Sequence, residues 1–231
     1  MYPHAHLPPP PAPQGRMRQQ RAADAGALEA VLAGMARHVD ELRMQQLGCI
    51  AISNVILGTD EAALLRQKRA AEGGALESVV HAMQIHAPSE GVVEEALAAL
   101  RNVTCGLDES GFLRKQRAAK AGALEAIVVG MCAFPSSLGI QEQGCAALAN
   151  ITLGSGSVAL ARKQRAADAG AIEAVVAIAH AANTVDVGAA PPQIQRLARA
   201  ALRTICHSDS LKAALLEAGG DESWLAYSTV P

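Results

Sequence analysis

Three asparagines spaced 48 residues apart are the side chains best suited to repeated hydrogen bonding in this chain. They are Asn54, Asn102 and Asn150. A carboxamide offers both a donor and an acceptor, so each could pair with one peptide unit of a bound chain without contacting its side chains. The alternative is that each asparagine caps the end of its own helix. Equal spacing predicts a ladder of such groups if successive 48-residue segments share one structure.

Polar side chains also stand eight residues before these asparagines. Eight residues are slightly over two turns of an α-helix, so each such side chain would share a face with its asparagine. Arg196 occupies this position before Thr204, which replaces the asparagine in the fourth segment. Together with the neighbouring arginine, the candidate peptide-binding residues are Asn54, Asn102, Asn150, Gln46, Glu94, Arg101 and Glu142.

Catalytic and metal-binding patterns are missing from the sequence. No GxSxG nucleophile motif and no GxxxxGK phosphate loop occur. The histidines have no ligand spacing, and the five cysteines form no CxxC pair. An odd number of unpaired cysteines favours reduced thiols inside a cell. We therefore expect no enzyme activity, no cofactor and no metal, and a cytoplasmic location with the nucleus as the alternative.

A repeat of 48 residues must position these groups. The segment Arg-Ala-Ala-Asp-Ala-Gly-Ala-Leu-Glu-Ala begins at Arg21 and returns in similar form at Arg69, Arg117 and Arg165. Between residues 114–128 and 162–176, 12 of 15 positions are identical. Such self-similarity at a fixed period is the signature of a repeat architecture.

Each repeat is predicted to contain three helices. In the second, Thr59 and Asp60 supply a cap, and a helix from Glu61 to Ala71 ends at two glycines. A second helix carries an apolar stripe at i, i+3, i+4 and i+7, and a third follows Pro88. The stripe consists of Leu76, Val79, Val80 and Met83. Because no unit could bury this stripe alone, the units must stack.

The Gly-Ala-Leu-Glu-Ala segment and the block Gly144-Cys-Ala-Ala-Leu-Ala-Asn150 resemble the second- and third-helix signatures of armadillo repeats. The resemblance covers about residues 17 to 220 and implies an all-α, right-handed α-solenoid of three-helix repeats. We expect a disordered Pro-rich segment over 1–16 and a C-terminal tail over 221–231. The expected units start near residues 17, 66, 114 and 162, with a partial fifth near 211.

Amino-acid composition limits the classes of partner expected for this chain. Aromatic residues make up 2% of the chain and the formal net charge is −2, so neither a basic field nor stacking platforms for nucleic acid are present. No apolar run is long enough to cross a bilayer, and the N-terminus lacks the layout of a signal peptide. We expect no nucleic-acid partner and no membrane insertion.

The resemblance implies that the asparagines line a concave groove and bond the backbone of an extended peptide. Importin-α has a tryptophan four residues before the asparagine, but here Ile50, Ala98 and Ala146 stand there, so a nuclear-localisation-signal receptor is not expected. The leading hypothesis is a non-catalytic adaptor that binds a protein or extended peptide. The alternative is a structural spacer or an end-to-end oligomerisation module. Replacing all three asparagines with alanine should then weaken binding and leave stability nearly unchanged.

Basic clusters recur in the predicted first helices: Arg66/Lys68/Arg69, Arg114/Lys115/Arg117 and Arg162/Lys163/Arg165. We interpret them as a solvated edge balanced by Glu29, Glu77, Glu125 and Glu173, with an acidic or phosphorylated partner or a membrane surface as the alternative. Arg199 stands where inner repeats have apolar residues, and the loop Ala181–Gln193 is six residues longer than its counterparts. Both ends are expected to expose packing surface and to permit end-to-end self-association, with Trp224 in the less stable C-terminal part.

Overall fold

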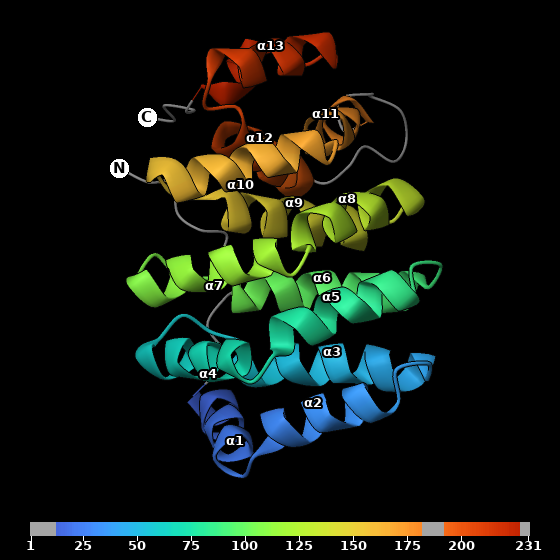
Figure 1. Ribbon diagram of the computed structural model, residues 1–231, viewed down its shortest axis with the longest axis vertical. Coiled ribbons are helices and arrows are strands. Elements are labelled where there is room, and N and C mark those ends of the chain that lie inside the picture. The colour runs from blue at the N-terminus through green and yellow to red at the C-terminus, as the bar shows by residue number, and fades with distance from the viewer. Residues whose placement is uncertain (1–12, 182–191, 227–231) are drawn as a thin grey trace.

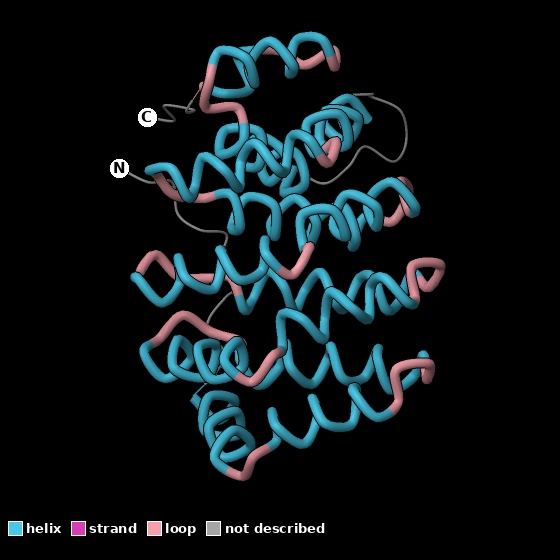
Figure 2. Tube along the Cα trace, in the orientation of Figure 1, coloured by secondary structure: helices cyan, strands magenta, loops and turns pink. Residues whose placement is uncertain are grey.

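The computed structural model describes residues 13–181 and 192–226. Within these residues every regular element is a helix and none is a strand (Figure 2). The helices stack one above another along the long axis, from α1 at one end to α13 at the other (Figure 1). The predicted all-α class is therefore confirmed.

Twelve of these helices form four units of three. The first helices are α1 (Pro13–Asp24), α4 (Glu61–Glu72), α7 (Glu109–Lys120) and α10 (Gly156–Asp168). The second helices are α2 (Ala27–Arg37), α5 (Ala75–Ile85), α8 (Ala123–Ala133) and α11 (Ala171–Ala181). The third helices are α3 (Leu42–Ile56), α6 (Glu90–Val103), α9 (Leu138–Thr152) and α12 (Pro192–Ile205). After them come α13 (Asp209–Glu217) and the short 3-10 helix η1 (Glu222–Leu225).

Local sequence sets the helix boundaries. The side chain of Asp60 accepts a hydrogen bond from the Ala63 amide, and Asp108 caps α7 in the same way, which satisfies amides that have no partner within the helix. One glycine joins the first and second helices of every unit in a left-handed conformation that other residues rarely adopt. These are Gly26, Gly74, Gly122 and Gly170, with φ of 80°, 93°, 91° and 87°.

The core runs without a break through all four units. The predicted stripe of α5, from Leu76 to Met83, is buried, and one apolar cluster extends from Leu28 to Trp224. The third helices make the most extensive contacts with one another, α3 with α6, α6 with α9 and α9 with α12. Each unit therefore completes its core only against its neighbours, as expected for a stacked repeat.

The predicted unit limits need correction at the N-terminal side. The first helices begin at residues 13, 61, 109 and 156, a few residues before the expected unit starts near 17, 66, 114 and 162, while the helix predicted to begin at Glu61 does begin there. The aspartate caps explain the earlier starts of α4 and α7, and proline is tolerated in the first turn of α1. Residues 13–16, predicted to be disordered, are helical. Residues 1–12, the long loop from residue 182 to 191, and residues 227–231 lie outside the described part.

The C-terminal end is better packed than predicted. The partial fifth unit begins at Asp209, but residues 221–226 are not a free tail, because η1 buries Trp224. The indole packs edge-on against His180 with ring centroids 5.3 Å apart, and the Trp224 carbonyl accepts from Arg203 Nε at 3.3 Å. The expectation that this end leaves its packing surface open is therefore wrong at Trp224, although Leu216 remains exposed.

The prediction that the basic clusters form a solvated edge is also wrong in part. Arg66, Arg114 and Arg162 are buried, and each donates from Nε to a carbonyl in the last turn of the preceding third helix. These carbonyls lack partners within their own helix, and a cation at a helix C-terminus is favourable. Burial nevertheless lowers the pKa of all three guanidinium groups. Lys115 and Lys163 are buried as well.

The outer arginines of the clusters are solvated and pair with glutamates as predicted, but with those of the preceding unit instead of the helix that follows. Three exposed ion pairs join first helices to the glutamates of the preceding unit: Arg69–Glu29, Arg117–Glu77 and Arg165–Glu125. Each spans 40 residues of sequence. Being exposed, each contributes at most about 1 kcal/mol.

Candidate binding surface

The asparagine ladder is largely used inside the fold. Asn102 and Asn150 are 3% and 2% exposed. Asn102 Nδ2 donates to Ser53 Oγ at 2.8 Å, and Asn150 Nδ2 donates to the Arg101 carbonyl at 3.1 Å. Ser53 and Arg101 immediately precede the asparagines of the preceding units. The carboxamides therefore join one unit to the next, which is neither the groove exposure nor the self-capping considered from the sequence.

Asn54 is the exception. It is exposed, and its backbone carbonyl accepts from Gln19 Nε2 of α1 at 2.8 Å. Asn54 lies in α3, the third helix of the first unit. Among the described residues no unit precedes α3, so none buries Asn54. The same residue type at the same register thus has two environments, and the presence of a preceding unit decides between them.

This difference predicts unequal effects of single substitutions. Asn102→Ala or Asn150→Ala should lower the free energy of unfolding by about 1 kcal/mol, because the buried carboxamide that bonds a partly buried acceptor in the preceding unit is lost. Asn54→Ala should change it by less than about 0.5 kcal/mol, since its side chain is exposed. Urea unfolding followed by circular dichroism would measure both. Equal effects at all three positions would contradict the inter-unit role.

Gln46 lies against the first turn of α6, and Glu94 lies against the first turn of α9. A Cβ atom at Gly91 would come within 2.6 Å of Gln46 Nε2, and one at Gly139 would collide with the Glu94 carboxylate. A larger residue at either place would force these flexible side-chain ends to move. In the last unit Gln193 takes the glycine position and donates from Nε2 to Glu142 Oε1 at 2.8 Å. These polar side chains are thus half-buried between units and only partly available to a ligand.

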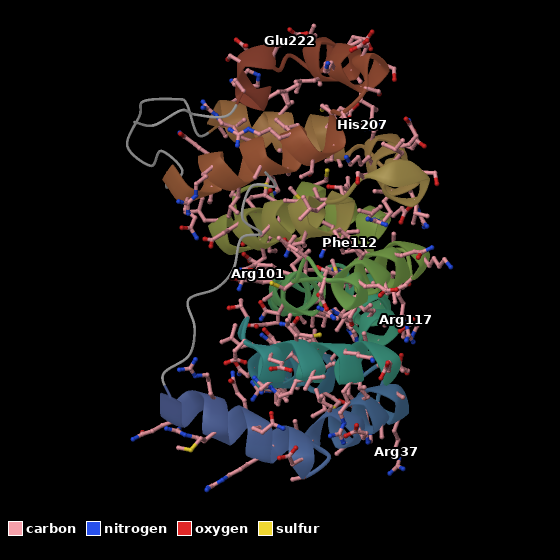
Figure 3. All side chains as sticks on the ribbon, turned by 90° about the vertical axis from the view of Figure 1, so that its left-hand side faces the viewer. Arg37, Arg101, Phe112, Arg117, His207 and Glu222 are labelled. Atoms are coloured by element: carbon pink, nitrogen blue, oxygen red, sulfur yellow. The ribbon has the colours of Figure 1, made fainter. Side chains whose placement is uncertain are left out.

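Arg101 and Glu142 connect the second and third units electrostatically. The Arg101 guanidinium donates from Nε and Nη2 to Asn102 Oδ1, at 3.3 Å each. Burial lowers the pKa of Arg101, and the Glu142 carboxylate opposes this shift. In Figure 3, Arg101 lies on the opposite side of the stack from Arg117. The predicted residues therefore do gather on the third-helix side, away from the ion pairs of the first helices.

Two side chains on this surface were missed in the sequence. Ser53 accepts the Asn102 carboxamide, and Gln143 Oε1 is buried without a hydrogen-bond partner in the described residues. Ser53 immediately precedes Asn54 and Gln143 immediately follows Glu142, but nothing in the spacing separates them from their neighbours. None of the four third helices carries an aromatic residue, so their surface offers only aliphatic, polar and charged groups.

The cysteine thiols are largely enclosed by the fold. All five cysteines are free thiols, and four of them are buried. Burial raises the pKa of Cys49 and of Cys145 to about 12, so their reactive thiolate forms are suppressed. Within residues 13–181 and 192–226, no cluster of three histidine, cysteine, aspartate or glutamate side chains could hold a metal ion.

The fold and this surface define the class of the chain as an all-α protein of stacked helical repeats. Comparison with protein-family models, with curated proteins and with solved structures found no match. In the part of the chain that the structure describes, no helix has the length and apolarity needed to cross a bilayer.

Proposed function

We propose that the chain is a right-handed armadillo-type α-solenoid that works as a non-catalytic adaptor and binds a protein segment along its third-helix face. The observation that carries the proposal is the unbroken side-by-side packing of α3, α6, α9 and α12. Such packing gives one elongated surface that spans all four units, which suits an extended ligand better than a compact one.

The chemistry of the face indicates the kind of segment it fits. Its half-exposed groups alternate in sign along the stack, from Glu94 through Arg101 and Glu142 to the exposed Arg196. A partner segment with both basic and acidic side chains would complement this order. The missing aromatic residues disfavour recognition by stacking, and the exposed Asn54 carboxamide remains free to bond a peptide backbone at one end.

Charge reversal on this face tests the proposal. Glu142→Lys should weaken partner binding about tenfold or more, because it places a like charge opposite a basic side chain of the ligand. A photo-crosslinking residue at position 94 would capture the partner, and titration of the captured partner would give the affinities. Lys68→Glu, on the exposed face of a first helix, is the matched control. Equal binding by both variants would place the partner elsewhere.

The alternative function, a structural spacer without its own ligand, is favoured by one observation. Asn102 and Asn150 use their carboxamides between units rather than toward solvent. A spacer would carry no partner that crosslinks to position 94. The crosslinking experiment therefore separates the two functions.

A further inference from the structure

The side of each third helix that meets the preceding unit follows from three contacts of α6. Gly91 lies against Gln46, Glu95 is close enough to Cys49 to raise the pKa of that thiol, and Asn102 donates to Ser53. All three contacts are made with α3. Gly91, Glu95 and Asn102 thus mark the face of α6 that covers the unit before it.

Shifting this register by 48 residues gives the equivalent face of α3: Arg43, Leu47 and Asn54. In the first unit α1 lies against only one end of it, where Gln19 bonds the Asn54 carbonyl. Among the residues that the structure describes, nothing covers the other end. Leu47 is 50% exposed, and Leu42 and Met44 are exposed beside it. The equivalents of Met44 in the next two units, Val92 and Ile140, are fully buried, so the exposure of Met44 marks an unpartnered packing surface.

This open end of α3 is also hollowed. A cavity of about 290 Å³ is lined by His38, Glu41, Arg43, Met44 and Leu47. The exposed Leu47 side chain projects beside this mostly apolar hollow. One surface therefore carries both a protruding side chain and a cavity that could receive one. Glu41 and Arg43 add one charge of each sign to the rim. A surface with both members of each complementary pair matches itself under a two-fold axis.

At the opposite end of the stack the last third helix is covered, although Leu216 of α13 is exposed. The face of α12 that a following unit would cover carries Arg196, Arg199 and Arg203, at the register of Gln46, Cys49 and Ser53 in the first unit. The backbone amide of Ser223 lowers the pKa of the Asp221 carboxylate, the nearby Arg199 charge adds to this shift, and Trp224 is buried in the same segment. A charged, covered face is a poor match for the apolar face of α3, so head-to-tail stacking is disfavoured.

We propose that the open face of α3, centred on Leu47, docks against the same face of a second copy of this chain to form a two-fold dimer. In this dimer Leu47 of each copy enters the hollow beside Met44 of the other, and Arg43 of each copy meets Glu41 of the other. The contact shares α3 with the proposed partner-binding face, but its central residues, Arg43, Met44 and Leu47, are not among those proposed to bind the partner segment. It does not depend on the proposed function.

Sedimentation equilibrium of the full chain tests this dimer. The wild type should be dimeric at micromolar concentration, and Leu47→Glu, which introduces the residue found at this register in the second unit, should weaken dimerisation at least tenfold. Leu65→Glu, at an exposed position of α4, is the control and should dimerise as the wild type does. Circular dichroism spectra would confirm that both variants are folded.

Exchanging the charges of Arg43 and Glu41 at the rim of the hollow tests the predicted contact more specifically. Arg43→Glu alone should weaken the dimer, because it places acidic groups on both sides of the contact, and combining it with Glu41→Arg should restore it. A wild type that is monomeric up to about 100 μM overturns the proposal. A dimer that appears only after removal of residues 1–12 also overturns it. An assembly of more than two copies that persists in Leu47→Glu has the same consequence.

Discussion

Replacing Arg114 with alanine is expected to lower the free energy of unfolding by about 3 kcal/mol, although its sequence neighbours read as a solvated basic cluster. The guanidinium donates to the carbonyls of Val103 and Cys105 at 2.7 Å each, and to Gln67 Oε1 of the preceding first helix at 3.1 Å. Alanine would leave these buried acceptors without a donor at a junction between units. Urea unfolding followed by circular dichroism would measure the loss.

The matched control is Arg117→Ala, one turn later in the same helix. Arg117 forms an exposed ion pair with Glu77, so its loss should cost less than about 1 kcal/mol. A small, equal effect of both substitutions would show that the whole cluster is solvated and that the buried position of Arg114 is wrong.

The pH dependence of stability should reveal Lys115. This side chain is fully buried, donates to the carbonyls of Thr104 and Gly106, and lies 5.6 Å from the centre of the Phe112 ring. Burial lowers the pKa of Lys115 from 10.5 to about 8. Between these two values the unfolded chain holds a proton that the folded chain has released, so this group makes stability rise with pH.

The wild type should therefore gain about 3 kcal/mol relative to Lys115→Met as the pH rises from about 7 to 10.5. The comparison must be relative, because the buried thiols act in the opposite direction. Burial raises the pKa of Cys206 to about 11, so unfolded thiols ionise first and stability falls as the pH increases. Lys68→Met, at an exposed position of α4, should follow the wild type. A constant difference between wild type and Lys115→Met across this range would contradict the shift.

Sequence periodicity was sufficient for the helices and their order. The left-handed glycines, such as Gly74, and the aspartate cap at Asp60 act within a few residues of the chain, so their effect can be deduced without a fold. The buried stripe of α5 follows equally from the 3.6-residue period. Both signals are local, and both were correct.

The position of charged groups could not be deduced in this way. Arg66 and Arg69 are three residues apart in one helix, and one is buried while the other pairs at the surface. Only the stacking of α4 against the end of α3 places the Val55 carbonyl within reach of Arg66. Hydropathy treats both arginines alike, because it contains no information about which face of a first helix meets a helix terminus.

What the sequence by itself determined is the repeated all-helical unit, since each unit is specified by caps, glycines and apolar spacing inside 48 residues. What only the tertiary structure decided is the use of the repeated side chains. Asn54 and Asn102 are identical in type and register, yet one is exposed and the other bonds Ser53. The reason is that a stacked unit acquires its environment from its neighbours, so the first and last units differ physically from the inner units that they resemble in sequence.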